Sequence, residues 1–432
     1  MKKILGLFLV ILMMATCFAP IALAAEGEVT TLVYYSWEDE DVYIKAVVDA
    51  FNASRDDIQV EYTSFSSMNS EYWTKVLVML AAREEIDIIG VNGVTDYSNF
   101  FSKGVLAPLS ELIAAKNYDM SGYGALVKQF AIDEDGKAEY YGLPHRRGVY
   151  ATFVNKTLFA EAGLEVPYDG WTFDEFVEMT HKMTKVLPDG RNQWGSAPRG
   201  LAWNEPHYAA FLHGQSPLDD DFSQFGVGLE LLNQLINGPQ KSSPGYTEMY
   251  QNPSEVTAGN FQKALLACHM LGDWGVTNMK RYQREGTMDP SVDWDVVPLP
   301  HFADTPNGTS YGSAILTGIT SYTQKKEAAF EFLSFLCSEE GAKIIASNGT
   351  MPGYQSEGVR EAYLDLDRSL NLKAFTDADV QPTAPAHPAS TDLVDMIRRE
   401  AELYLIGEQD LETTVANVER ERKEIIERAG SF

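Results

Sequence analysis

Apolar positions between residues 30 and 91 alternate between the period of a strand and the period of a helix. Residues 30–35 are mostly β-branched or aromatic, as in a buried strand, and an amphipathic helix is expected to follow and run through Phe51. Residues 58–62 alternate as a second strand, residues 71–83 have the period of a second helix, and residues 86–91 form an apolar third strand. This β-α-β-α-β order predicts a parallel, doubly wound α/β sheet.

A second α/β unit is expected in the middle of the chain. Residues 149–154 have the pattern of an apolar strand, and a helix is expected to follow at residues 156–162. Thr172 and Glu175 have the spacing of a capping box, which indicates the start of another helix. Further helices are expected up to Lys185, around residues 206–213 and over residues 228–237.

The start of the chain has the pattern of a signal peptide. Two lysines precede an apolar run at residues 4–15 that is short for a bilayer span, and the small residues around Ala24 suit a signal peptidase. We therefore expect residues 1–24 to be removed and the mature chain to be exported in soluble form, to the periplasm or the outer face of the membrane. The alternative is a lipoprotein in which Cys17 becomes the lipidated amino terminus.

Length, composition and charge restrict the class of protein. The 432 residues include 45% hydrophobic and 22% charged residues, which is globular, and the length favours two or three domains. The formal net charge at pH 7 is -28. A surface this acidic repels nucleic acid and anionic lipid, so neither is expected as a partner.

Two cysteines remain after the predicted cleavage. Cys268 and Cys337 each lie in an apolar run, so both are expected to be buried thiols. Export would also permit a single disulfide between them, which is the alternative.

Several segments in sequence order carry a likeness to a known family. Tyr141-Gly142-Leu143-Pro144 leads through Phe153-Val154-Asn155-Lys156 to Trp171-Thr172-Phe173-Asp174-Glu175-Phe176. These segments resemble the family of extracellular solute-binding proteins that includes maltose-binding protein. Gln262 departs from the family, which usually has a glycine there. Further similar segments, which extend the likeness over most of the mature chain, lie at residues 261–274, 293–313 and 325–343.

The resemblance implies two α/β lobes, each a doubly wound sheet flanked by helices, with crossing strands between them. It implies a carbohydrate ligand in the cleft, hinge closure around it, and delivery to the permease subunits of an ABC importer by a monomeric receptor. The strand pattern that returns at residues 315–321 fits a first lobe made of two parts. The expected division is an N-terminal lobe of residues 25–144 and 316–357 and a C-terminal lobe of residues 145–315 and 358–432.

Candidates for the ligand site come from two sources. Trp37, Glu38, Thr95 and Asp96 follow the first and third predicted strands, and ligands of doubly wound sheets bind beyond the carboxyl ends of strands. This mixture suits a sugar, whose C–H face stacks on aromatic rings and whose hydroxyls bind planar polar groups. The family's cleft positions, carried over one at a time, add Asp39, Arg146, Trp203, Glu205, His207, Trp274, Gly312 and Ser313.

Most of these aromatic and acidic candidates have an alternative role. Trp37 and Trp274 lie at turns, which favours stacking on a sugar over packing in the core, whereas the two roles are balanced for Trp203. His207 is more typical of a helix surface or of a histidine satisfied within the protein. Residues 38–41 can equally be a solvated acidic turn.

The adjacent arginines bear on the charge of the ligand. Arg146 and Arg147 should point to opposite faces of their strand, and the register favours Arg146 as the cleft residue. Two arginines would suit an acidic sugar such as a uronide, but the acidic surface weakly repels an anion. A neutral oligosaccharide therefore remains the expected ligand.

A secreted glycoside hydrolase is the main alternative function. It would need two acids across the scissile bond, and nothing among Glu38, Asp96 and Glu205 marks one as acid and another as nucleophile. Residues 308–312 match the G-x-S-x-G pattern of serine hydrolases, but a strand rather than a helix is expected after them. The sequence has no HExxH, CxxC or P-loop motif, so neither a metal nor a cofactor is expected.

Overall fold

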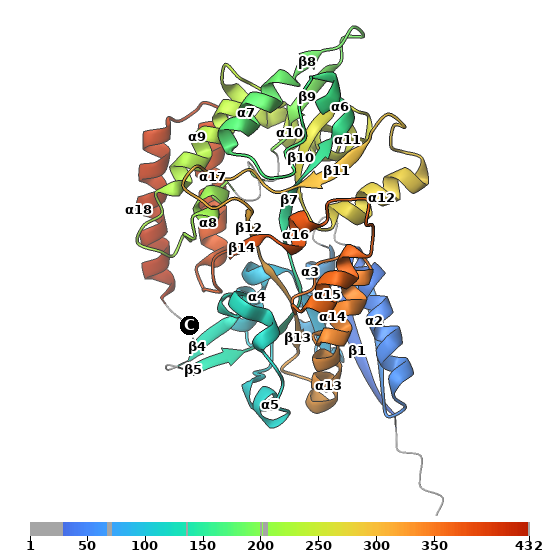
Figure 1. Ribbon diagram of the computed structural model, residues 1–432. Coiled ribbons are helices and arrows are strands. Elements are labelled where there is room, and N and C mark those ends of the chain that lie inside the picture. Colours follow the sequence, from blue (N-terminus) through green and yellow to red (C-terminus); the bar gives the residue numbers. More distant parts are fainter. Residues whose placement is uncertain (1–28, 67–70, 135–136, 199–200, 202–205, 431–432) are drawn as a thin grey trace, which may run out of the picture.

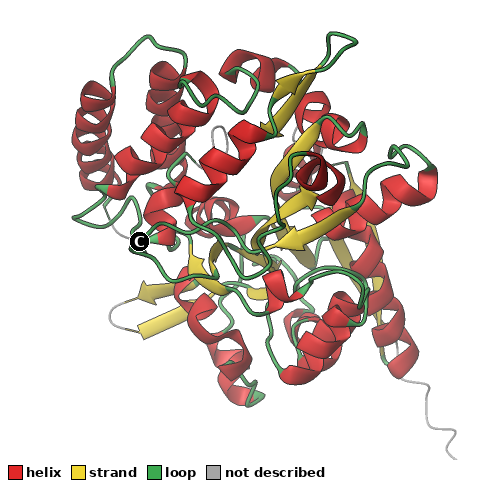
Figure 2. Ribbon diagram, turned by 45° about the horizontal axis from the view of Figure 1, so that its top comes forward, coloured by secondary structure: helices red, strands yellow, loops and turns green. Residues whose placement is uncertain are grey.

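The computed structural model describes residues 29–430, apart from 67–70, 135–136, 199–200 and 202–205. It contains two five-stranded sheets, one above the other in Figure 1, with helices packed around each. Figure 2 shows the strands inside and the helices mostly outside. The predicted signal peptide and Cys17 lie outside the described residues.

The first sheet has the strand order β2-β1-β3-β13-β6. Its strands are β1 (Thr30–Trp37), β2 (Ile58–Phe65), β3 (Ile88–Val91), β6 (Leu143–Arg147) and β13 (Ala314–Ile319). β1 pairs in parallel with β2 and β3, as predicted, but β13 is antiparallel to both β3 and β6. The sheet is therefore mixed rather than parallel, because β6 leads out toward the second sheet and β13 returns from it.

Helices cover the first sheet on the faces where its apolar side chains lie. Leu32 and Tyr34 of β1 are fully buried, and Ile44, Val47 and Phe51 of the amphipathic helix α2 belong to the same core. Burial of such a face stabilises the fold by about 25 cal/mol per Å² of apolar surface. The helices around this sheet are α2 (Asp41–Ser54), α3 (Glu71–Ala81), α4 (Gly93–Ser102), α5 (Ser110–Ala115), α13 (Lys326–Leu336) and α14 (Glu339–Ser347).

The second sheet has the strand order β11-β7-β10-β9-β8. Its strands are β7 (Tyr150–Asn155), β8 (Lys185–Val186), β9 (Asn192–Ser196), β10 (Leu266–Gly272) and β11 (Trp294–Val297). The predicted capping box is present: Thr172 accepts from the Glu175 N–H, and the Glu175 carboxylate accepts from the Thr172 N–H, at the start of α7 (Phe173–Lys182). α7 ends before Lys185, where a longer helix was predicted, because Lys185 begins β8.

The remaining helices flank the second sheet or lie beside the connections between the sheets (Figure 1). They include the long antiparallel pair near the carboxyl terminus, which packs against α9. Their bounds are α6 (Lys156–Glu161), α8 (Tyr208–Leu212), α9 (Gln224–Asn237), α10 (Tyr246–Gln251), α12 (Gly275–Glu285), α15 (Glu357–Leu364), α16 (Lys373–Thr376), α17 (Ser390–Leu405) and α18 (Leu411–Ala429).

Three connections between the sheets run side by side. The link from β6 to β7 contacts the link from β12 (Thr309–Gly312) to β13, because the Gly148 N–H donates to the Ser313 carbonyl at 3.0 Å. The Arg147 N–H donates to the Met351 carbonyl at 3.0 Å and so joins the third connection, which follows α14. β12 also pairs in parallel with β14 (Asp379–Pro382).

The two cysteines are free thiols and both are buried, as expected. Cys268 lies in a core of the second sheet and Cys337 in the core of the first, so the alternative of a disulfide between them is wrong. Within the described part of the chain, no helix has the length and apolar character that crossing a membrane requires.

Candidate functional site

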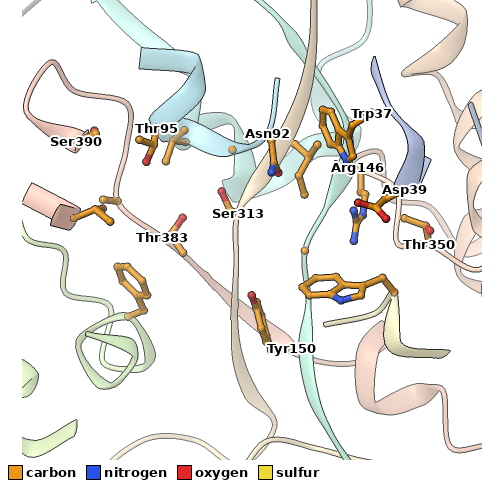
Figure 3. Close-up of a pocket in the computed structure, with 18 of the residues that line it drawn as sticks. Trp37, Asp39, Asn92, Thr95, Arg146, Tyr150, Ser313, Thr350, Thr383 and Ser390 are labelled. Atoms are coloured by element: carbon orange, nitrogen blue, oxygen red, sulfur yellow. The ribbon is translucent and has the colours of Figure 1, made fainter. Parts of the chain in front are cut away.

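A cavity of about 650 Å³ lies where the two sheets face each other. Its walls come from the ends of β1 and β3, from the three connections, and from α8, α12 and the start of α17. In Figure 3, Asp39, Arg146 and Thr350 lie on one side of this cavity, and Thr95, Thr383 and Ser390 on the other. The predicted site residues among its lining are Trp37, Asp39, Thr95, Arg146, His207, Trp274 and Ser313.

Aromatic rings form the wall on the side of the second sheet. Trp274 lies two residues after the end of β10 and meets the ring of Tyr150 edge-on, with the ring centroids 5.5 Å apart. Tyr150 in turn stacks on Tyr311 at 4.5 Å. Because each ring is held by its neighbours, Trp274 and Tyr150 can present apolar surface without first being ordered.

Trp37 differs from the expectation that its ring is free to stack on a ligand. Its side chain is 4% exposed, and its indole stacks on Trp73 and meets Tyr72 edge-on. Trp37 therefore borders the cavity mainly as a packed wall, since helix α3 covers the ring.

Arg146 is buried at the cavity wall with a carboxylate beside it. Its Nη2 lies 3.5 Å from Oδ1 of Asp273, and its guanidinium lies 5.2 Å from the ring centroid of Trp274. Burial alone would lower the pKa of Arg146, but Asp273, Tyr43 and Glu40 together outweigh burial and raise it above the ordinary value. The guanidinium therefore stays charged and is fixed in place.

Asp273 was not singled out from the sequence, yet it joins several segments at this point. Besides Arg146, its carboxylate accepts hydrogen bonds from the N–H of Met351 at 2.9 Å and of Val149 at 3.4 Å. Burial raises its pKa, against the opposing effect of Arg146. Asp273 thus ties the turn that carries Trp274 to two of the three connections.

A buried polar network lies beneath the floor of the cavity. Glu40 accepts hydrogen bonds from Ser36 (2.5 Å) and from Tyr43 (2.6 Å), and its Oε1 is 2.9 Å from Nε2 of His145. The other ring nitrogen of His145 is 2.9 Å from Oγ1 of Thr317. Burial would raise the pKa of Glu40, but His145 and the two hydroxyls lower it, so Glu40 is an ionised buried anchor.

His207 was a candidate for the ligand site, with a helix surface or a satisfied histidine as its alternative role, and it is buried in the cavity wall. Its ring packs on Phe211 with centroids 4.5 Å apart. Burial, with a smaller effect from Arg398, lowers its pKa to about 3, so His207 is neutral at pH 7.

Three predicted residues lie away from this cavity. Glu38 is exposed and accepts a hydrogen bond from Ser66 at 3.0 Å. Asp96 accepts from the indole N–H of Trp73, and burial raises its pKa to about 6. Gly312 borders a different, smaller cavity. Trp203 and Glu205 fall outside the described residues.

Sequence reasoning missed much of the lining, because part of it comes from segments with no strand pattern or known motif, and a predicted helix or strand does not by itself show which side chains face a cavity. Asn92 could have been found, since it follows β3 directly at the carboxyl end of the sheet. Folding of the third connection and the carboxyl-terminal segment brings in Thr350, Thr383, Ser390 and Arg398. Tyr43, Tyr150 and Phe211 reach the cavity from α2, β7 and α8.

Among the described residues, the structure supports neither of two kinds of catalytic site, a metal site or a serine nucleophile. No group of three His, Cys, Asp or Glu side chains suited to a metal ion occurs within the described ranges. Ser310 of the G-x-S-x-G match lies buried inside β12 and donates its hydroxyl to the Tyr150 carbonyl at 2.7 Å. The strand predicted after this match is β13, so the strand-turn-helix context of a nucleophile elbow is not met.

Known proteins show the same architecture. A sugar transporter from Rhizobium etli in an open conformation superposes with a TM-score of 0.77 at 21% identity, covering 91% of this chain and 99% of that one. An ABC substrate-binding protein from Listeria monocytogenes in complex with cycloalternan has a TM-score of 0.76 at 22% identity, covering 93% of this chain and 100% of that one. These likenesses confirm the predicted two-lobed α/β fold.

The sequence comparisons agree with the fold. A multiple sugar-binding protein of Streptococcus mutans is 25% identical over 402 residues, which is 87% of this chain and 86% of that protein. The family model described as bacterial extracellular solute-binding protein matches residues 35–343. The resemblance predicted from the sequence is thereby confirmed, and this chain belongs to the family of bacterial extracellular solute-binding proteins.

Proposed function

We propose that this protein captures a carbohydrate, an oligosaccharide, in the cavity between its two sheets and delivers it to the permease subunits of an ABC importer. The observation that carries the proposal is the composition of the cavity, whose lining combines the rings of Trp274 and Tyr150 with the polar side chains of Asp39, Asn92 and Thr95. The relatives from Streptococcus mutans and Listeria monocytogenes, one named as a multiple sugar-binding protein and one in complex with cycloalternan, support it.

The chemistry of a sugar matches this composition. The C–H face of a pyranose is apolar and packs on an aromatic ring, whereas its hydroxyl rim needs donors and acceptors in fixed positions. A cavity of about 650 Å³ is within the range of small-ligand sites and has room for more than one sugar ring.

We propose a neutral sugar rather than a uronide. Arg146 is already paired with Asp273 and would have to leave that carboxylate to bind another. Breaking a buried ion pair leaves an uncompensated charge, which costs several kcal/mol. In its observed place Arg146 can donate to sugar hydroxyls without losing its partner.

Delivery requires that the importer distinguish the loaded receptor from the empty one. The two sheets are joined by the three connections, so rotation about these segments would bring both cavity walls onto a ligand and create the surface that permeases bind. We place this receptor outside the cytoplasm, as a monomer, after removal of the predicted signal peptide.

The alternative of a glycoside hydrolase is less favoured because too few carboxylates line the described part of the cavity. Asp39 is the single Asp or Glu among the described residues that line the cavity, and a hydrolase needs two. Glu38 and Asp96, which sequence left open for such a role, have other partners. We therefore propose binding without catalysis.

Isothermal titration calorimetry of the mature chain against neutral and uronic-acid oligosaccharides tests this function. We expect saturable binding of a neutral oligosaccharide that is recovered unchanged. Trp274→Ala should weaken that binding about 30-fold, since a central aromatic contact is worth about 2 kcal/mol.

Tyr322→Ala is the matched control, because Tyr322 is 44% exposed and outside the cavity, and it should bind like the unaltered protein. Equal weakening by both substitutions would mean that the cavity is not the site. Cleavage of the oligosaccharide during the titration would instead establish the hydrolase.

A further inference from the structure

A second cavity, of about 240 Å³, lies next to Arg147 of β6. Arg147 borders this cavity and Arg146 the larger one, as expected for consecutive residues of a strand, whose side chains point to opposite faces. The smaller cavity is formed by the segment η3 (Ser121–Gln129), by Gly312 of β12, by β14 and by Gln355 after the third connection. It therefore involves all three connections between the sheets.

Arg147 has no ionic partner among the described residues. No hydrogen bond or ion pair of its side chain is found there, and its buried Nε lacks an acceptor. Burial lowers the pKa of Arg147 to about 10, and the carboxylate that opposes this effect is Asp273. That carboxylate is already shared by Arg146 and two backbone N–H groups, so one positive charge remains uncompensated at this point.

Asp119, two residues before the start of η3, is bound to other groups. Asp119 accepts hydrogen bonds from the Ser121 N–H at 2.9 Å and from the Tyr354 hydroxyl at 3.3 Å. Gly312, which lines the cavity, is held by Gln129, whose side-chain amide donates to the Gly312 carbonyl and accepts from the Ala314 N–H. The walls are thus fixed by their own hydrogen bonds, and none of these bonds satisfies Arg147.

We propose that the cavity beside Arg147 binds a small oxyanion, a carboxylate or a phosphate, at a site separate from the carbohydrate cavity. Arg147 is partly buried and its Nε is fully so. Removing a charge from water without giving it a partner is costly, and an anion that reaches the guanidinium offsets that cost. The planar guanidinium presents two parallel N–H groups, which match two oxygens of one oxyanion better than a halide. The volume admits an anion of a few heavy atoms and excludes an oligosaccharide.

Differential scanning calorimetry with inorganic phosphate or acetate, each against chloride at the same ionic strength and without sugar, tests this site. A ligand bound only by the native state raises the melting temperature in a saturable way. We expect such a rise with phosphate, acetate or both, and the two arms identify which oxyanion fits. Arg147→Gln should abolish the rise.

Arg284→Gln is the control, because Arg284 is exposed in the last turn of α12 and should leave the rise unchanged. No rise in the unaltered protein, an equal rise with chloride, or an undiminished rise in Arg147→Gln would each overturn the proposal. If Arg147→Gln does not fold, Arg147→Lys decides, since a point charge without the planar fork should give a smaller rise and an undiminished one would exclude the site.

Discussion

Arg146 and Arg147 show how far neighbouring side chains can differ within one strand. Asp273, Tyr43 and Glu40 together raise the pKa of Arg146 against the effect of burial, whereas burial lowers the pKa of Arg147 to about 10. The alternation of side chains along a strand predicted that the two would separate, and Arg146 does line the larger cavity. The ion pair with Asp273 was beyond prediction, because it joins residues far apart in the chain.

The effect of burial on the pKa of a carboxyl group, and through it on stability, can be tested at Asp96. Its pKa is raised to about 6 from an ordinary 3.8, so between these pH values the unfolded state ionises while the folded state stays protonated. Stability is therefore lost as the pH rises from about 4 to 6, by roughly 3 kcal/mol over about two pKa units. Asp96→Asn, which keeps an acceptor for the Trp73 indole, should remove this loss.

Chemical denaturation of both proteins at pH 4 and pH 7 measures the difference. The substitution should stabilise the protein at pH 7 relative to the unaltered chain and have little effect at pH 4. An equal effect at both values would show that Asp96 is ionised in the folded state throughout this range.

Local patterns determined the elements themselves with good accuracy. The capping box at Thr172 and Glu175 was read from spacing alone and is present at the start of α7, because its hydrogen bonds involve only residues three apart. The direction of β13 was not predictable in this way, since it depends on the route by which the chain returns between the sheets.

Thr172→Ala tests the contribution of that cap to the helix. Loss of the N-cap hydrogen bond should lower the free energy of unfolding by about 1 kcal/mol, measured by calorimetry as a lower melting temperature. Asp174→Asn in the same turn is the control: Asp174 is exposed, and a change of only a few tenths of a kcal/mol is expected. If the two variants behaved alike, the cap would not be the source of the stabilisation.

At the scale of the whole molecule, two of the connections between the sheets can approach closely because Gly312 has no Cβ. A Cβ built on Gly312 would lie 1.8 Å from the Gly148 carbonyl oxygen, so Gly312→Ala must push two connections apart. We expect a loss of about 1–3 kcal/mol in the free energy of unfolding, together with weaker carbohydrate binding. Calorimetry and titration of the same variant measure both.

Gly245→Ala is the matched control for this close approach. Gly245 has a φ of -65° and open space where a Cβ would lie, so its substitution should change stability by less than about 0.5 kcal/mol. Stability and binding of Gly312→Ala equal to those of this control would show that the connections can separate freely.

The sequence alone determined the α/β class, most strands and helices, the family, and candidates such as Asp39, Arg146 and Trp274, because these follow from periodicity, capping and motifs within short segments. Tertiary structure decided the rest: it packed Trp37 against Trp73, turned Glu38 and Asp96 to other partners, and brought Thr383, Ser390 and Arg398 to the cavity. The physical reason is that burial and pairing depend on contacts between distant segments, and these form only when the connections bring the two sheets together.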